Sequence, residues 1–86
     1  MKELSQIRTE IDQIDAELTE LFKRRMDCSK AVAKYKKANG IPILNAAREE
    51  EVLDSVEQKG GEYGKYAREL FAKIMELSRA LQEEMI

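Results

Sequence analysis

Residues 4–38 read LSQIRTEIDQIDAELTELFKRRMDCSKAVAKYKKA, without a glycine or a proline. Apolar residues recur there in alternating steps of three and four, at Leu4, Ile7, Ile11, Ile14, Leu18 and Leu21, and then at Cys28, Val32 and Tyr35. This spacing places them along one side of an α-helix. We therefore predict one long helix from about Lys2 to Ala38, with Cys28 as a small apolar residue of its buried seam.

The rest of the chain predicts two shorter helices. Asn39-Gly40 and Pro42 end the long helix, because glycine accepts the left-handed conformation and proline cannot continue a helix. Asn45 is a favourable N-cap for a second helix. After the break at residues 59–64, a third helix is predicted from about Lys65 to Met85. The 86 residues, 37% charged and 6% aromatic, thus predict a single all-α domain over residues 1–86.

The long helix does not suit a compact monomer. About 36 residues at 1.5 Å per residue give a helix of roughly 54 Å. A compact chain of 86 residues has a radius of gyration of about 12 Å. Two shorter helices cannot cover the apolar seam along its whole length. We therefore expect a second copy of the chain to cover the remainder, in a twofold homodimer.

The composition excludes several classes of function. The net charge of −2 leaves no basic excess for phosphates, so we expect no nucleic-acid partner. With no histidine and a single cysteine, Cys28, we expect neither a transition-metal site nor an intrachain disulfide. Residues 1–6 are largely charged and polar where a signal peptide is apolar, and no apolar stretch is long enough to cross a bilayer. We expect a cytoplasmic protein without a membrane partner.

Charged and polar side chains interrupt the apolar faces of all three predicted helices. They are Arg25 and Lys36 on the first helix, Arg48 and Glu49 on the second, and Ser78 and Gln82 on the third. Lys36 follows Arg25 by about three helical turns, so both project from nearly the same side. Burying such groups is costly unless they are paired.

Two interpretations of these groups remain open at this point. In the first, Arg25 forms a structural ion pair with Glu49 that fixes the register of the helices. In the second, Arg25, Lys36 and Arg48 converge and leave an excess of positive charge. Such an excess would bind a small anion, and arginine would grip its carboxylates in bidentate fashion.

A series of short motifs also runs through the chain. They are Ile7-Arg8, Ile11-Asp12-Gln13-Ile14-Asp15, Leu18, Leu21 and Arg25, then Val32-Ala33-Lys34-Tyr35-Lys36, Gly40-Ile41-Pro42-Ile43, Arg48-Glu49, Leu70-Phe71-Ala72-Lys73-Ile74-Met75-Glu76, Ser78-Arg79 and Gln82. Each is weak alone, but the set is specific in this order and with these gaps. On these motifs the chain resembles the all-helical chorismate mutases over nearly its full length.

The resemblance implies an intertwined helical homodimer with two identical active sites. Each site would convert chorismate to prephenate, in phenylalanine and tyrosine biosynthesis, without a cofactor or a metal. One arginine of each site would come from the other subunit, and it matches Arg8. Geometry agrees, because Arg8 lies roughly 25 Å before Arg25 and about 100° around the same helix.

The family pattern also implies roles for individual residues. Arg25 and Arg8 of the partner subunit would bind the substrate carboxylates, with Ser78 and Arg48. Lys36 and Gln82 would donate hydrogen bonds to the ether oxygen, and Glu49 would accept one from the ring hydroxyl. The family often has aspartate where this chain has Asn45. Asn45 would therefore contact the substrate or only cap its helix.

Two other functions compete with this one. An enzyme resembling isochorismate pyruvate lyase would use the same scaffold and the same cationic pocket. A non-catalytic helical dimerisation or regulatory module would use the scaffold without any pocket chemistry, and would tolerate replacement of Arg25 and Lys36.

Overall fold

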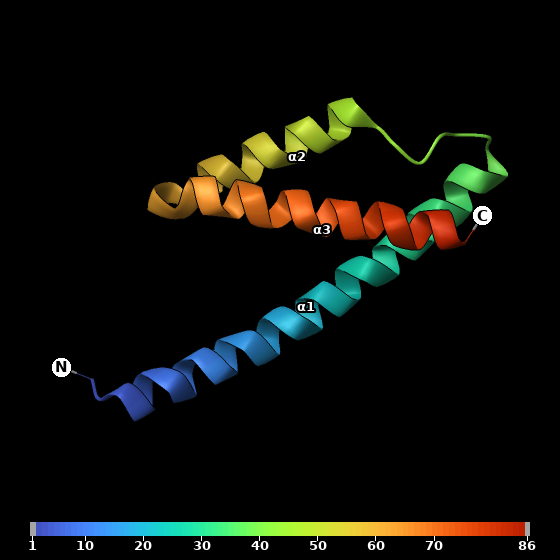
Figure 1. Ribbon diagram of the computed structural model, residues 1–86. Helices are drawn as coiled ribbons and strands as arrows, with labels where there is room; N and C mark the ends of the chain where they lie inside the picture. The colour runs from blue at the N-terminus through green and yellow to red at the C-terminus, as the bar shows by residue number, and fades with distance from the viewer. Residues whose placement is uncertain (1, 86) are drawn as a thin grey trace.

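The computed structural model describes residues 2–85, and within them it contains helices and no strands. The order is α1 (Leu4–Ala38), α2 (Ala46–Lys59), a short 3-10 helix η1 (Gly61–Tyr63) and α3 (Gly64–Glu84). In Figure 1, α2 and α3 form a hairpin, and the C-terminal half of α1 lies against α3. The N-terminal half of α1 diverges from both. The predicted all-α architecture of one long and two shorter helices is confirmed.

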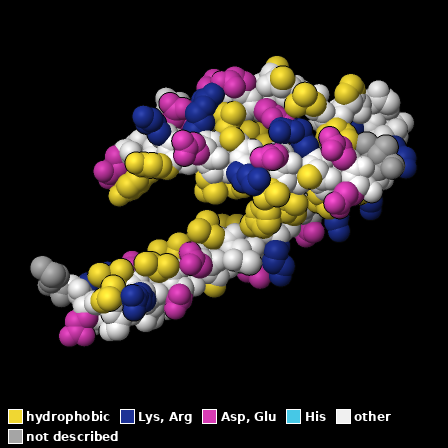
Figure 2. Space-filling model, in the orientation of Figure 1, with side chains coloured by type: hydrophobic (Ala, Val, Ile, Leu, Met, Phe, Trp, Pro, Cys, Tyr) yellow, Lys and Arg dark blue, Asp and Glu magenta, His cyan; other side chains and the backbone are white. Residues whose placement is uncertain are grey.

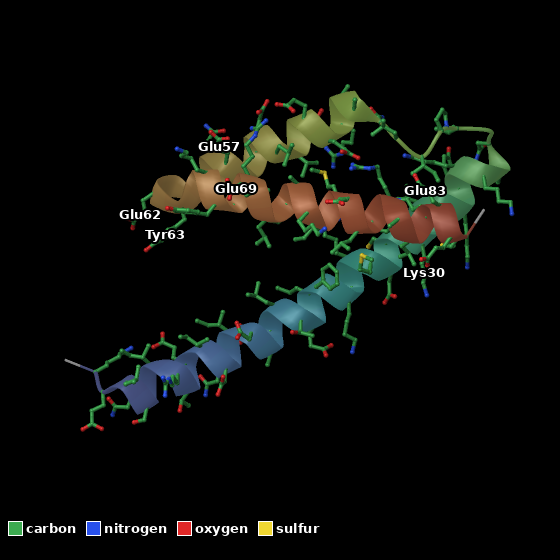
Figure 3. All side chains as sticks on the ribbon, in the orientation of Figure 1. Lys30, Glu57, Glu62, Tyr63, Glu69 and Glu83 are labelled. Carbon is green, nitrogen blue, oxygen red and sulfur yellow. The ribbon has the colours of Figure 1, made fainter. Side chains whose placement is uncertain are left out.

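The ends of the helices have the local causes that the sequence indicates. Gly40, after α1, has a positive φ of 63°, which glycine adopts without strain. The Asn45 side chain caps α2 by accepting a hydrogen bond of 3.0 Å from the backbone N–H of Arg48. The break before α3 is a 3-10 turn, from which Glu62 and Tyr63 extend outward (Figure 3).

The α2–α3 hairpin is closed by a tight contact and a charge cluster. A Cβ atom on Gly64 would lie 2.3 Å from the carbonyl oxygen of Glu57, so only glycine fits at this crossing. Arg68 on α3 donates to Asp54 (2.9 Å), to Glu57 (3.1 Å) and to Glu50 on α2. These bonds, the one to Asp54 foremost, raise the pKa of the Arg68 guanidinium above its ordinary value. Arg68 thus links α3 to three carboxylates of α2.

The chain is elongated, and much of its apolar surface is uncovered. Its radius of gyration is 16.1 Å and its extents are 56 × 23 × 14 Å, well beyond the roughly 12 Å of a compact domain. Leu4, Ile14, Leu18 and Leu21 are each between 48% and 60% exposed. Figure 2 shows hydrophobic side chains gathered along one side of the diverging half of α1. Soluble monomers rarely expose a contiguous apolar strip of this kind.

The buried side of α1 differs from the prediction in one respect. Cys28 is exposed rather than buried, and Val32 is also exposed. The residues of α1 that are buried against α3 are Ser29 and Ala33, one position later in each case. The reason is that α1 meets α3 only in its C-terminal half, where the crossing turns this neighbouring row inward. One residue is a rotation of about 100°.

None of the helices within residues 2–85 combines the length and the apolar character that a bilayer crossing requires.

Candidate active site

A cavity of about 340 Å³ lies where the three helices and the connector before α2 meet. This volume falls in the range of sites for small molecules. All the site residues predicted from one subunit line it, namely Arg25, Lys36, Asn45, Arg48, Glu49, Ser78 and Gln82. Apolar side chains fill much of the remaining wall, among them Cys28, Val32, Ile43, Val52 and Met75. Arg8 does not line the cavity, and it lies on the diverging half of α1.

Each helix contributes one row of side chains to the cavity. On α1 the lining residues are Arg25, Cys28, Ser29, Val32 and Lys36. Each lies three or four residues from another, which keeps them on one side of the helix. The first turn of α2 supplies Arg48 and Glu49, next to the Asn45 cap. The last turns of α3 supply Ser78, Arg79 and Gln82.

Lys36 ties the connector to α1. Its Nζ donates a hydrogen bond of 2.6 Å to the backbone carbonyl of Ile43. Lys36 also belongs to the last turn of α1, where the helix dipole favours a cation. An ammonium group has three donor hydrogens, so the bond to Ile43 leaves Lys36 with two others for a ligand.

Glu49 is paired with a residue that the sequence interpretation missed. The Nη1 of Arg79 donates to both carboxylate oxygens of Glu49, and both side chains are largely buried. The alternative in which Arg25 pairs with Glu49 is therefore wrong. The Arg25 guanidinium instead lies 5.8 Å from the centre of the Phe71 ring, a cation–π arrangement.

Arg48 and Asn45 stand at the edge of the cavity. Arg48 lines it while pairing with Glu51 one turn further along α2, and both of these side chains are about two-thirds exposed. An exposed pair of this kind is weak, so a ligand carboxylate can compete for the guanidinium. Asn45 accepts the Arg48 N–H with its side-chain oxygen, and its own amide hydrogens remain for a ligand.

A chain of hydrogen bonds between residues that line the cavity crosses from α3 to α1. Gln82 Nε2 donates to Ser78 Oγ at 3.1 Å, and Ser78 Oγ lies 2.6 Å from Ser29 Oγ. Ser29 Oγ in turn donates to the Arg25 carbonyl at 3.2 Å. Ser29, Ser78 and Gln82 are each at least 93% buried. Buried polar groups that are linked in this way hold a fixed geometry.

The cavity carries an excess of positive charge. Its lining includes four cationic side chains, Arg25, Lys36, Arg48 and Arg79, and one carboxylate, Glu49. Because Arg79 neutralises Glu49, the charges that remain for a ligand are cationic. Within residues 2–85, Arg25 has no carboxylate within ion-pair distance. The site is suited to an anion with more than one carboxylate.

Arg79 and Ser29 are the polar residues of the cavity that sequence reasoning missed. Ser29 lies four residues after Arg25 and three before Val32, which indicates the same side of α1. Arg79 directly follows Ser78, and it is the last cation of the chain. A lone cation near Ser78 and Gln82 is a signal that could have been used. Among residues 2–85, no group of histidine, cysteine or acidic side chains could hold a metal ion.

Comparison with known proteins points to one family. The profile described as "Chorismate mutase type II" matches residues 7–83. A conserved hypothetical protein of known structure from Pyrococcus furiosus superposes with a TM-score of 0.75 at 39% identity, over 92% of this chain and 93% of its own. The fold and much of the sequence are therefore shared with a solved structure.

Several relatives have names that describe an activity, among them the following three. The "Intracellular chorismate mutase" of Mycobacterium tuberculosis is 40% identical over 67% of this chain and 55% of its own length. The "4-amino-4-deoxychorismate mutase" of Streptomyces venezuelae is 31% identical over 72% of this chain and 60% of its own. The chain thus spans little more than half of these two. The "Chorismate mutase" of Methanocaldococcus jannaschii is 29% identical over 100% of this chain and 90% of its own.

Proposed function

The chain belongs to the chorismate mutase type II family, and on that premise we propose that it rearranges chorismate to prephenate. The observation that carries the proposal is that cations from three helices and one carboxylate line the same cavity. Chorismate is a dianion with two carboxylates, an ether oxygen and a ring hydroxyl. The cavity offers a complementary group for each of these features.

The proposed reaction is an intramolecular Claisen rearrangement. The ether C–O bond breaks while a new C–C bond forms, and no atom enters or leaves. The protein holds the flexible dianion in its reactive chair-like conformer. It also stabilises the negative charge that grows on the ether oxygen as the C–O bond lengthens. Neither task needs a nucleophile, a metal or a redox group.

Arginines would hold the two carboxylates. Within residues 2–85 Arg25 has no carboxylate partner, and it lies against Phe71, so its guanidinium is pre-positioned for a carboxylate of the substrate. Arg48 can exchange its exposed contact with Glu51 for a stronger bidentate contact inside the cavity. Arg8 of the partner subunit would supply a further contact to the substrate carboxylates, since Arg8 of the same chain does not line the cavity.

Lys36 on α1 and Gln82 on α3, which both line the cavity, would act on the ether oxygen. Lys36 has donor hydrogens beyond the one given to Ile43, and Gln82 has a second Nε2 hydrogen beyond the one given to Ser78. The carboxylate of Glu49, held by Arg79, would accept the hydrogen of the ring hydroxyl. Asn45 both caps α2 and lines the cavity, so it can take part in that contact.

We further propose that the active form is an intertwined homodimer. The apolar strip on the diverging half of α1, Leu4, Ile7, Ile11, Ile14, Leu18 and Leu21, is 40–60% exposed in a single chain. Packing two such halves against each other would bury both strips and bring Arg8 toward the partner's cavity. A sedimentation mass of two chains at micromolar concentration is expected, and a stable, active monomer would contradict this arrangement.

The activity is tested by following the loss of chorismate absorbance on adding the purified chain. Isochorismate serves as the parallel substrate, with pyruvate release as its readout. We expect prephenate from chorismate and at most slow pyruvate release from isochorismate. Faster turnover of isochorismate would favour the lyase alternative, and inactivity toward both substrates would favour a non-catalytic module. A cytoplasmic place in phenylalanine and tyrosine biosynthesis is part of the same proposal.

The 4-amino analogue of chorismate tests the role of Glu49. Its amino group carries a positive charge at neutral pH and would meet a cavity that already has a cationic excess. Arg79 already engages the one carboxylate that could pair with it. We therefore expect kcat/KM to be higher for chorismate than for the amino analogue. A higher kcat/KM for the amino analogue would contradict chorismate as the substrate and favour the analogue instead.

Replacing Arg79 is expected to weaken catalysis although Arg79 need not touch the substrate. Arg79→Met removes the partner that holds Glu49 and leaves a largely buried carboxylate unpaired, which is destabilising. We expect kcat/KM for chorismate to fall about tenfold. Lys73→Met is the matched control, because Lys73 is an exposed cation of α3 that pairs with Glu76 and does not line the cavity. Equal activity in the two variants would contradict the role given to Arg79.

Gln82 predicts a flat pH profile in the weakly acidic to neutral range. The amide of Gln82 does not titrate, so it donates to the ether oxygen at every pH in that range. A carboxyl group at the same position would have to be protonated to donate, and burial raises the pKa of a carboxyl group. Gln82→Glu should therefore keep activity at pH values below that pKa and lose it above. A steep acid-only profile in the unmodified protein that Gln82 substitutions abolish would contradict this assignment.

A further inference from the structure

Ser29 is a buried hydroxyl that the proposed mechanism does not use. It lies on α1 one turn after Arg25, is 6% exposed, and contacts Ser78 of α3 at 2.6 Å between the two Oγ atoms. A buried polar group is costly unless its hydrogen bonds are met. The bonds of Ser29 fix the direction of the whole hydrogen-bond chain that ends at Gln82.

The direction follows from counting hydrogens, since a hydroxyl group has one. The hydrogen of Ser29 is given to the Arg25 carbonyl at 3.2 Å. Ser78 must therefore be the donor in its 2.6 Å contact with Ser29. Ser78 then has only lone pairs left, so in this arrangement it has no hydrogen for a substrate carboxylate, the role that the family resemblance implies for it. Gln82 must turn its Nε2 toward Ser78, as the 3.1 Å bond shows.

With the hydrogen bonds donated in this direction, from Gln82 through Ser78 to Ser29, the Gln82 amide has an orientation that its own hydrogen bonds do not favour. Its Oε1 is buried and has no hydrogen-bond partner within residues 2–85, and an unmet buried acceptor is unfavourable. The reversed amide would place Oε1 against Ser78, where it would gain a hydrogen only if Ser78 could donate to it. Ser78 cannot do so while it donates to Ser29.

We propose that Ser29 is a positioning residue that fixes the orientation of the Gln82 amide, through the Ser78 hydroxyl, so that Nε2 keeps a hydrogen for the substrate. The inference rests on the proposed function for the identity of that substrate. It adds that Ser29, two hydrogen bonds away from Gln82, decides whether the Gln82 amide offers Nε2 or Oε1 to that substrate.

Ser29→Ala is the direct test. Without the Ser29 acceptor, the hydrogen of Ser78 can go to Oε1, and the two orientations of Gln82 become comparable. We expect kcat for chorismate to fall about two- to tenfold, the equivalent of one net hydrogen bond, with KM little changed because the arginines are untouched. Ser29→Thr keeps the hydroxyl and should restore most of kcat.

Two comparisons separate positioning from simple packing. Ala33→Gly alters the next buried residue on the same face of α1 and has no hydroxyl to lose, so it should lower Tm without lowering kcat. In a Gln82→Ala background, Ser29→Ala should cause no further loss of kcat. An unchanged kcat in Ser29→Ala, or a loss that is fully additive to that of Gln82→Ala, would overturn the inference.

A signal that does not depend on turnover completes the test. The side-chain amide protons of Gln82 should shift in the NMR spectrum of Ser29→Ala and stay in place in Ala33→Gly. If the unmodified protein turns over no chorismate, the proposed function fails, and the amide signals still decide the role of Ser29. Unmoved Gln82 signals in Ser29→Ala would overturn the inference whatever the substrate.

Discussion

Lys36→Ala is expected to lower kcat/KM for chorismate by about a hundred- to a thousandfold, or ~3–4 kcal/mol, as for loss of an electrostatic donor. Lys36 is the cation that would face the ether oxygen as negative charge develops there. Its ammonium lies in the last turn of α1, fixed by the Ile43 carbonyl at 2.6 Å. Because this contact acts mainly in the transition state, kcat should fall more than KM rises.

The loss must be distinguished from a loss of structure. Lys36→Ala also removes the bond to Ile43, so Tm is measured for each variant. Lys37→Ala is the matched control, since Lys37 is the adjacent exposed lysine and does not line the cavity. We expect near-normal rates for Lys37→Ala and a folded Lys36→Ala. Normal turnover in Lys36→Ala would show that the site is assigned wrongly.

Arg8→Ala is expected to reduce kcat/KM about a hundredfold or more, as for loss of a charged contact to the substrate. The effect would be large although Arg8 does not line the cavity of its own chain and lies roughly 25 Å along the helix from Arg25. Its substitution should leave Tm almost unchanged, because the described residues give Arg8 no ion pair or side-chain hydrogen bond to lose.

Arg24→Ala provides the comparison for Arg8. Arg24 is an exposed arginine of the same helix that does not line the cavity, and its removal changes the net charge equally. We expect Arg24→Ala to retain full activity. If both arginines could be removed without a loss of rate, the dimer would contribute no residue to catalysis.

The helices could be predicted from the sequence because their signals are local. Gly40, Pro42 and the Asn45 cap mark the connector whatever the rest of the chain does. The rows of Arg25 and Lys36 on α1 and of Ser78 and Gln82 on α3 also follow from helical periodicity. Their meeting in one cavity could be expected, because these are the inward polar positions of the three helices.

The pairing of charges could not be predicted in the same way. Arg25 was the one partner proposed for Glu49 from the sequence, and periodicity does not show which cation of another helix reaches it. The crossing of α3 over α2 places Arg79 against Glu49 and leaves Arg25 over Phe71. The same limit explains why Cys28 is exposed although it was predicted to be buried. Periodicity predicts correctly that the seam is one face of a helix, but the α1–α3 crossing buries Ser29 and Ala33 instead.

The apolar surface of the N-terminal half of α1 is explained only by an assembly of two chains. The apolar residues of the strip from Leu4 to Leu21 remain 40–60% exposed in a single chain. Its periodicity predicted a helix with a buried face, and a second copy is the partner we propose for it. The proposal that Arg8 belongs to the partner's site depends on this assembly.

The most direct measurement of the shared site mixes two inactive variants. Arg8→Ala and Arg25→Ala chains are unfolded together in equal amounts, refolded, and assayed with chorismate. Random pairing makes about half of the dimers mixed, and each mixed dimer has one site with both arginines, so about a quarter of the normal rate should return. A mixture as inactive as its separate components would contradict a site that is built from two chains.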